Sequence, residues 1–281
     1  MRVALAQMYC EWGNVKDNLR RSRQHMRTAK REGADLVVFP ETSVHGLWKD
    51  YLVRLAAESM EGEIVGRMRG WAKELGIGVG FGLAERTREK PYNAFVVVDR
   101  EGEIVGVHRK NNVTQLEGLF YRSDRRRPVF EFTGVRMGVG ICADCGCEEL
   151  MRSYGRRKVE VLLMPHAWDA DPILKGGKTA GWSTIEEMVD FNARGQVVGY
   201  RSHAEMLERF MARAAASCRE HGYYGLFVNQ VGQPHPLIPF VGPSFGMDPQ
   251  GKVLARSRNK REGVLLVDID VGMPRCGCQP D

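Results

Sequence analysis

The stretch over residues 135–150 constrains this chain more than any other part of it. Residues 135–141 alternate apolar side chains with small or polar ones, which is typical of a half-buried strand, and residues 148–152 have the pattern of a helix start. Cys142 therefore lies at the carboxyl end of a strand, in a sharp turn toward a helix. Such a turn lifts the thiol out of the sheet and points the following backbone N–H groups at whatever the sulfur attacks. The stretch indicates either a nucleophilic cysteine or a small buried hydrophobic residue.

The start of the chain predicts a β-α-β unit. Residues 3–8 and 35–40 have the pattern of apolar strands, and an amphipathic helix begins between them after Asn14, which suits the N-cap position. This order implies a sheet with a helix packed on its face. Further strand and helix patterns alternate along the chain, so the sequence predicts an α/β fold.

Length and composition fit one large core. The chain has 281 residues, of which 43% are hydrophobic, and α/β proteins of this size commonly form one domain. We expect a single domain over residues 1–281. Residues 169–200 are rich in glycine and charge and are expected to form a lid or an insertion near the site. Residues 272–281 are polar and are expected to form a mobile tail.

The charge pattern excludes some classes of partner. The net charge of +6 comes from 41 basic and 35 acidic residues, which makes a mixed surface. The densest basic run, residues 122–127, is short and interrupted by Asp124, so we do not expect nucleic-acid binding. No long apolar run predicts a membrane span or a signal peptide. Seven cysteines, an odd number in a chain too long to need disulfides, favour reduced thiols and a cytoplasmic location.

Two other reactive side chains follow predicted strands. Glu41 comes directly after residues 35–40, and Lys110 comes just beyond the strand predicted at residues 104–108. The functional rim of an open α/β sheet lies outside the carboxyl ends of its strands, so we expect Glu41 and Cys142 to lie close together. A thiol needs a base, which a shielded carboxylate can provide. A nearby ammonium favours the thiolate and can stabilise an oxyanion.

These three residues lie in motifs that resemble those of the nitrilase, or carbon-nitrogen hydrolase, superfamily, and in the same order. The stronger matches are Phe39-Pro40-Glu41, His108-Arg109-Lys110, and Gly140-Ile141-Cys142-Ala143-Asp144 leading to Glu149 and Arg152. Weaker matches are Met164-Pro165-His166-Ala167-Trp168, residues 227–232, residues 242–244 and residues 248–251. Each match alone is weak, but the ordered set covers nearly the whole chain and is specific.

The resemblance implies a four-layer αββα sandwich that pairs through a helical face into a homodimer or a larger homo-oligomer. It also implies the roles of the site residues. Cys142 is the nucleophile, Glu41 is the general base and later the acid, and Lys110 stabilises the tetrahedral intermediate together with the backbone N–H of Ala143. The reaction that the resemblance implies needs neither a metal nor an organic cofactor.

The family usually has a second glutamate after the lysine. Glu117 is the candidate in this chain, and Glu131 is the fallback. Ala143-Asp144 stands where true nitrilases of the family usually have Trp-Glu, which favours the amidase and carbamoylase branches. We therefore expect hydrolysis of a small amide or N-carbamoyl compound, with release of ammonia or an amine. Nitrile hydrolysis and acyl transfer to an amine remain alternatives.

Other positions leave the details of the pocket open. Trp48, His166 and Trp168 either line a substrate pocket or pack at strand ends. Gly146-Cys147-Glu148 stands where relatives often have an aromatic-proline pair before the glutamate, and this difference puts the shape of the turn in question. In the helix that follows, Glu149 and Arg152 are expected to pair and brace it.

Two readings of other classes compete with an enzyme. Cys142, Cys145 and Cys147 could form part of a zinc site completed by His166 or by the pair Cys276 and Cys278, although this spacing is unusual for zinc. A partner-binding protein that has kept the fold without activity is the other alternative. A binding protein has no need for Glu41, Lys110 and Cys142 together, so we expect a hydrolase with a small-molecule substrate.

Overall fold

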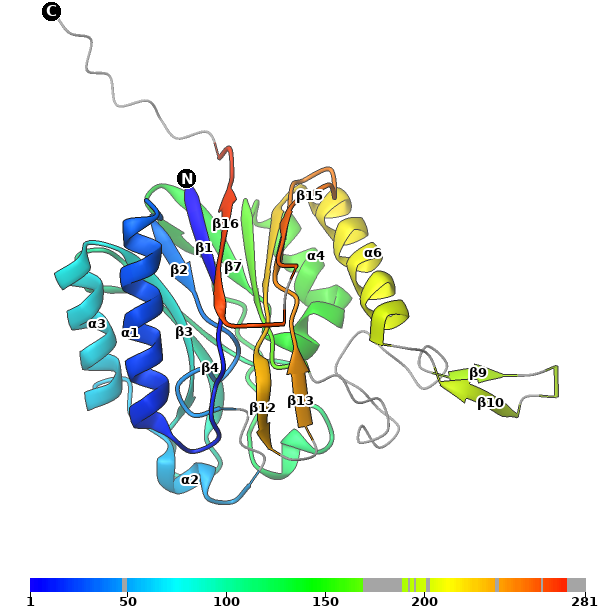
Figure 1. Ribbon diagram of the computed structural model, residues 1–281, viewed down its shortest axis with the longest axis horizontal. Coiled ribbons are helices and arrows are strands. Elements are labelled where there is room, and N and C mark those ends of the chain that lie inside the picture. The colour runs from blue at the N-terminus through cyan, green and yellow to red at the C-terminus, as the bar shows by residue number, and fades with distance from the viewer. Residues whose placement is uncertain are drawn as a thin grey trace, which may run out of the picture.

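The structure is a computed structural model that describes residues 1–46, 50–168, 189–191, 193–194, 196–200, 203–235, 238–258 and 260–271. Two six-stranded sheets stack face to face, with helices on both outer sides (Figure 1). The arrangement is the αββα sandwich that the sequence comparison implied, and the α/β class is confirmed. Within the described part of the chain, no helix is both long enough and apolar enough to cross a membrane.

The first sheet has the strand order β16-β1-β2-β3-β4-β5. Its strands are β16 (Gly263–Asp268), β1 (Arg2–Gln7), β2 (Leu36–Val38), β3 (Gly78–Glu85), β4 (Tyr92–Val98) and β5 (Ile104–Arg109). Strands β1, β2 and β3 are parallel, whereas β16, β4 and β5 pair antiparallel to their neighbours. The parallel strands end at the same edge of the sheet, and Glu41 follows β2 at that edge.

The second sheet has the strand order β15-β14-β11-β8-β7-β6. Its strands are β15 (Val253–Arg256), β14 (Phe245–Met247), β11 (Tyr224–Val228), β8 (Val161–Pro165), β7 (Val135–Val139) and β6 (Phe130–Phe132). Strands β7, β8 and β11 are parallel. Cys142 follows β7, so it too lies beyond the carboxyl end of a parallel strand.

Helices cover the two outer faces. On the first sheet lie α1 (Val15–Arg31) and α3 (Glu63–Leu75), and on the second lie α4 (Glu148–Arg156) and α6 (His203–His221) (Figure 1). The side chain of Asn14 caps α1 by accepting from the N–H of Asp17 at 3.2 Å, as the sequence predicts. Gly76 ends α3 in the left-handed conformation, with φ of 59°, which costs a glycine little.

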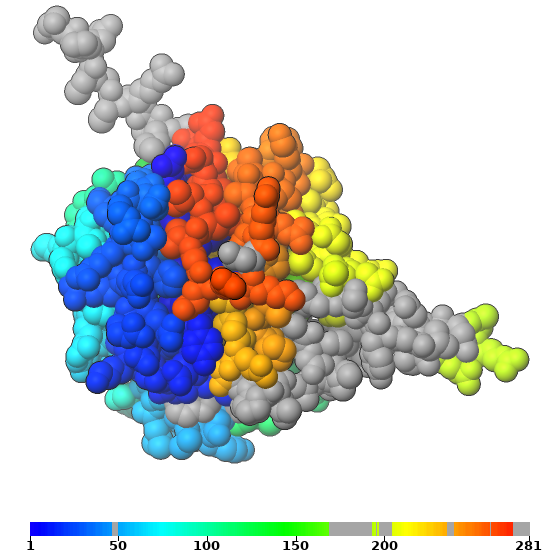
Figure 2. All heavy atoms as spheres, viewed as in Figure 1, coloured from blue at the N-terminus to red at the C-terminus, as the bar shows by residue number. Residues whose placement is uncertain are grey.

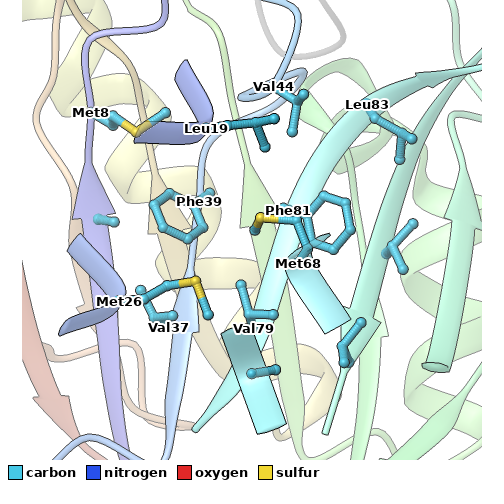
Figure 3. Packing of buried hydrophobic residues seen from close by; sticks show 14 of the residues in the cluster. Met8, Leu19, Met26, Val37, Phe39, Val44, Met68, Val79, Phe81 and Leu83 are labelled. Carbon is cyan, nitrogen blue, oxygen red and sulfur yellow. The ribbon is translucent and has the colours of Figure 1, made fainter. Parts of the chain in front are cut away.

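Strand alternation builds the layers. In β1, Val3 and Leu5 point between the two sheets, while Ala4 and Ala6 face α1 and α3. Figure 3 shows the outer cluster, in which Met26 and Met68 lie with apolar side chains of the first sheet. Because strands of both sheets are buried on two faces, they appear in the sequence as nearly continuous apolar runs.

The start and the end of the described chain lie side by side. β16 pairs antiparallel with β1 along its whole length, and Arg2 forms an ion pair with Asp268 at 2.8 Å. Figure 2 shows these two segments as adjacent blue and red surfaces. β16 thereby extends the first sheet past its first strand and covers an edge that would otherwise be open.

Shorter elements complete the chain. They are α2 (Val53–Ala56), the 3₁₀ turns η1 (Glu117–Leu119) and η2 (Cys142–Gly146), the pair β9 (Val189–Phe191) and β10 (Val197–Tyr200), and the pair β12 (Val231–His235) and β13 (Ile238–Val241). Most of the segment 169–200, expected as a lid or an insertion, lies outside the described residues. The tail 272–281 lies outside them as well.

The turn that follows β2 packs tightly against β3. A Cβ atom at Gly82 would lie 2.3 Å from the backbone nitrogen of Thr42 and 3.0 Å from the carbonyl carbon of Glu41. The hydroxyl of Ser43 accepts from the N–H of Gly82 at 3.1 Å, so the two segments are also joined by a hydrogen bond. Only glycine allows this approach, and the approach fixes the position of Glu41.

We expect Gly82→Ala to destabilise the protein by about 2 kcal/mol, because the added methyl group would displace backbone rather than a flexible side chain. Gly66→Ala is the matched control, since Gly66 lies in α3 and an added Cβ atom there would have no other heavy atom within 4 Å. The control should stabilise by about 0.5–1 kcal/mol. Urea unfolding measures both changes, and equal unfolding midpoints for the two variants would contradict this packing.

The same turn is anchored by a buried histidine. The Nε2–H of His45 donates to the carbonyl of Ala56 at 2.9 Å, and its Nδ1 accepts from the N–H of Ala84 at 3.1 Å. His45 therefore joins the turn after Glu41 to both α2 and β3. Burial lowers the pKa of His45 from 6.5 to about 4, although the hydrogen bond to Ala56 acts in the opposite direction.

Acid should loosen this anchor. Because folding lowers the pKa of His45, its contribution to stability is complete above pH 6.5 and is lost progressively between pH 6.5 and 4. Between pH 7 and 4.5 we expect wild type to lose on the order of 2–3 kcal/mol more than His45→Asn, whose side chain keeps an acceptor but does not titrate. Urea unfolding at the two pH values measures the difference. Equal losses of unfolding free energy in wild type and His45→Asn would contradict this role of His45.

Candidate active site

Glu41 is held rigidly in the interior. Its Oε1 accepts hydrogen bonds from Lys110 Nζ at 2.7 Å and Asn93 Nδ2 at 2.8 Å, and its Oε2 accepts from the N–H of Ala167 at 2.9 Å. The side-chain amide of Gln230 donates to the backbone carbonyl of Glu41 at 2.9 Å. Both sheets therefore fix this carboxylate, because Asn93 lies in β4 while Ala167 follows β8.

Lys110 lies one residue beyond β5 and carries its charge into the core. Its Nζ donates to Glu41 Oε1 at 2.7 Å and to Glu117 Oε1 at 2.8 Å, and its side chain is 1% exposed. Burial alone would lower the pKa of Lys110, but the charges of Glu117, Glu41 and Cys142 outweigh it and raise the pKa well above its ordinary value. The residue is therefore an ammonium at neutral pH.

The structure distinguishes between the two candidates for the second glutamate. Glu117 begins η1 and is buried, and its Oε2 accepts from the N–H of Thr114 at 2.9 Å while Oε1 binds Lys110. Glu131 is exposed in β6 and is not part of this cluster. The ion pair with Lys110 thus involves the expected residue rather than the fallback, while the role of Glu117 in a reaction stays a prediction.

Cys142 begins η2 in an unusual backbone conformation. Its φ is +47°, in the left-handed region that side chains other than glycine rarely adopt, and such a residue costs about 1–3 kcal/mol. The surrounding structure must hold it there. The side chain packs on the side of the turn that faces the space between the sheets, and its thiolate form raises the pKa of Lys110. Cys142 is 8% exposed, more than Glu41, Lys110 or Glu117.

A second cysteine in the same turn points the other way. Cys145 packs in the cluster beneath α4 and α6, and its Sγ donates to the carbonyl of Gly140 at 3.3 Å. Burial raises the pKa of Cys145 well above its ordinary value, and the carboxylate of Asp144 adds to this effect. Of these two thiols, Cys142 is the one on the side of Glu41 and Lys110.

Three pocket candidates have different outcomes. The ring of His166 lies 4.3 Å from that of Phe227 and 5.3 Å from that of Phe210, and the ring of Trp168 lies 5.4 Å from that of Phe210. These contacts match the packing alternative, and a role for His166 and Trp168 in substrate binding stays a prediction. Trp48 lies outside the described residues.

The prediction that Glu149 and Arg152 pair with each other is wrong. Arg152 pairs with Glu148 at 3.6 Å, one helical turn away, and Glu149 pairs with Arg127 at 3.0 Å. Helix spacing allows Arg152 to reach either Glu148, four residues away, or Glu149, three residues away, and the contact of Glu149 with Arg127 leaves Glu148 as the partner. Arg127 instead ties α4 to the segment before β6.

The zinc alternative has no support in the described part of the chain. No group of three or more histidine, cysteine, aspartate or glutamate residues there is arranged to hold a metal ion. Cys142 and Cys145 point to opposite sides of η2. Cys276 and Cys278, the proposed completing pair, lie outside the described residues.

Sequence patterns missed the amides that support the site. Asn229 Oδ1 accepts from the N–H of Trp168 at 2.9 Å, and its Nδ2 donates to the carbonyl of Trp168 at 3.1 Å. This pairing holds the segment that presents Ala167 to Glu41. Asn229 and Gln230 lay within the weak family match over residues 227–232, but no role was inferred for them. A second signal was that these polar residues follow directly after the buried strand β11, where buried polar side chains need hydrogen-bond partners.

Comparison with known proteins agrees with this arrangement. The model of the carbon-nitrogen hydrolase family matches residues 2–275. The chain is 25% identical to N-carbamoylputrescine amidase of Solanum tuberosum, over 96% of this chain and 86% of that protein. It is 30% identical to glutamine-dependent NAD(+) synthetase of Thermotoga maritima, over 96% of this chain but 42% of that longer protein.

Solved structures show the same architecture. An amidase from Nesterenkonia sp. AN1 superposes with a TM-score of 0.75 at 21% identity, covering 97% of this chain and 94% of that one. This likeness concerns the fold, and the match to the family model extends over almost the entire sequence. The chain belongs to the carbon-nitrogen hydrolase family.

Proposed function

We propose that this protein hydrolyses the carbon-nitrogen bond of a small amide or N-carbamoyl compound through a thioester on Cys142. The observation that carries the proposal is the buried ammonium of Lys110, held between Glu41 and Glu117 at 2.7 and 2.8 Å beside the Cys142 turn. A buried ion triad of this kind costs desolvation energy, and a core that only had to pack would do as well with apolar side chains. Perturbed ionisable groups of this kind cluster at functional sites.

The first half of the reaction would form the thioester. Glu41 accepts the proton of the Cys142 thiol, and the sulfur attacks the carbonyl carbon of the substrate. The backbone N–H of Ala143 and the ammonium of Lys110 stabilise the oxyanion that develops. Two of the three N–H donors of Lys110 bind carboxylates, which leaves the third for this oxygen. The carbon-nitrogen bond then breaks as Glu41 returns its proton to the departing nitrogen.

The second half would release the acid. Glu41 takes a proton from a water molecule, whose oxygen attacks the thioester carbon, and the sulfur leaves as it takes that proton from Glu41. Glu117 would contribute through Lys110, because it supplies the second negative charge that keeps the ammonium charged and in place. No step in this scheme requires an electron carrier or a metal.

The substrate class rests on two supports. Ala143-Asp144 replaces the Trp-Glu pair usual in true nitrilases, as the sequence comparison indicated. The relative in Solanum tuberosum is an N-carbamoylputrescine amidase, and the Nesterenkonia amidase has been solved in complex with butyramide. We therefore favour amides and N-carbamoyl compounds over nitriles as substrates of this chain, with transfer of the acyl group to an amine as the alternative outcome.

The proposal extends to the organisation of the protein. We propose that residues 1–281 form one domain, that the protein assembles as a homodimer or a larger homo-oligomer, and that it works in the cytoplasm. The family resemblance supports the assembly. The free state of the cysteines in the described residues supports a reducing compartment.

Ammonia release from a panel of primary amides, N-carbamoyl amino acids and amines, and nitriles tests the function. We expect wild type to release ammonia from amides or N-carbamoyl compounds, and Cys142→Ala to release at least about 1,000-fold less, because the nucleophile is absent. Cys145→Ala is the matched control, since that thiol packs on the helix side of η2, and its rate should stay within a few-fold of wild type.

The panel can contradict the proposal in two ways. If Cys145→Ala lost activity while Cys142→Ala kept it, the assignment of Cys142 as the nucleophile would be wrong. Activity confined to nitriles would place the protein in the nitrilase branch of the family instead of the amidase and carbamoylase branches. If wild type releases no ammonia and no thioester is found by mass spectrometry, the partner-binding alternative gains support.

Glu117→Gln tests the second glutamate. We expect its kcat to fall about 10- to 100-fold with a KM within a few-fold of wild type, because Lys110 loses one of its two charged partners while the binding surface is unchanged. Glu131→Gln is the control, as this exposed residue of β6 was the other candidate, and its kcat should equal that of wild type. Steady-state kinetics would contradict the assignment if only Glu131→Gln were impaired.

A further inference from the structure

Asp144 is a fully buried carboxylate that no step of the proposed reaction uses. Its Oδ2 accepts from His108 Nε2 at 2.9 Å and from the N–H of Ile141 at 3.1 Å. Its Oδ1 accepts from the N–H of Asn111 at 3.0 Å and from the N–H of Asn112 at 2.7 Å. Four donors converge on one side chain that is 0% exposed.

The donors come from the two segments that carry the reactive groups. Asn111 and Asn112 directly follow Lys110, whereas Ile141 directly precedes Cys142. The side chain of Asn112 makes a further hydrogen bond to the turn that holds Cys142, in which its Nδ2 donates to the carbonyl of Ala143 at 3.0 Å. The backbone is thus held on both sides of Cys142 by the segment that begins at Lys110.

We propose that Asp144 is a positioning residue, which sets the spacing between Lys110 and Cys142 and aims the N–H of Ala143 at the substrate oxygen. The inference rests on the proposed function of the same site. It explains how Cys142 keeps a φ of +47°, since the bonds to Ile141 and Ala143 fix the strained residue from both ends. A displacement of about 1 Å between reacting groups can cost 100-fold in rate, so this spacing matters.

The chemistry of the four donors requires a carboxylate. Both oxygens of an aspartate are acceptors, whereas an asparagine offers one oxygen and one NH₂ group that would face two backbone or ring N–H groups. His108 cannot easily compensate. Its Nε2 donates to Asp144, and its Nδ1 is buried without a partner among the described residues, so a change of tautomer would bury an unpaired N–H.

A merely structural role would have a different signature. If Asp144 only stabilised the fold, its loss would lower the fraction of folded protein while each folded molecule kept its kcat. If it positions the turn, kcat falls in protein that is folded, because Cys142, Ala143 and Lys110 no longer meet the substrate together. The two roles separate when rates are divided by the folded fraction.

The test compares Asp144→Asn with Asp99→Asn. Asp99 makes a similar local arrangement in the β4–β5 hairpin, where its Oδ1 accepts from the N–H groups of Glu101 at 3.0 Å and Glu103 at 2.8 Å. On an amide that wild type hydrolyses, we expect Asp144→Asn to lower kcat per folded molecule about 100-fold with KM within about threefold. Asp99→Asn should match wild type in both parameters.

Asn112→Ala keeps the inference testable if Asp144→Asn does not fold. This variant removes one exposed side chain and its bond to Ala143, and leaves Asp144 and its four donors in place. We expect a kcat about 5- to 10-fold below wild type, an unchanged KM and an unchanged melting temperature. Wild-type kcat in both Asn112→Ala and folded Asp144→Asn would overturn the proposal.

A probe that needs no substrate separates this inference from the proposed function. The rate at which iodoacetamide alkylates Cys142, followed by peptide mass mapping across pH, reports the surroundings of the sulfur. We expect the midpoint of the profile for Asp144→Asn to differ from that of wild type by about half a pH unit or more, and that of Asp99→Asn to coincide with it. If wild type hydrolyses no amide, the proposed function fails, and coincident profiles for all three proteins would overturn the positioning role as well.

Discussion

The rest of this structure depends on the ion pairs of one buried ammonium group. An ammonium in the interior is tolerable only when carboxylates stand within hydrogen-bond distance, and Lys110 has two, from Glu41 and Glu117. Those carboxylates must in turn be fixed, which the amide of Asn93 and the N–H of Ala167 do for Glu41. The hydrogen bonds around this charge therefore join segments of both sheets at one site.

The layered architecture supplies the rigidity for this cluster. Glu41 and Cys142 follow parallel strands of different sheets, so the stacking of the sheets decides how far apart they lie. Apolar side chains such as Leu5 and Leu163 fill the space between the sheets and leave little freedom for sliding. Local strain at Cys142 is then held by hydrogen bonds around the turn rather than by the core alone.

Much of the fold and part of the site followed from local patterns. Strand and helix periodicity located most elements, because burial on one or two faces leaves a regular trace in the sequence. It missed β6, whose three residues are too few to show alternation, and the β12–β13 pair, in which Pro234 and Pro239 interrupt the strand pattern. The pairing of Arg152 with Glu148 was also missed, since it depends on which face of α4 is free.

The sequence by itself determined the α/β class and which reactive side chains follow strands, namely Glu41, Lys110 and Cys142, because these properties depend on neighbouring residues. Only the tertiary structure decided what those side chains contact. The direction of Cys145 toward the helices and three of the four donors around Asp144 depend on segments distant in the chain, and the choice of Glu117 over Glu131 depends on which of them reaches Lys110. Hydrogen bonds between such segments leave no periodic signal, since they are made by single residues brought together by the packing of the two sheets.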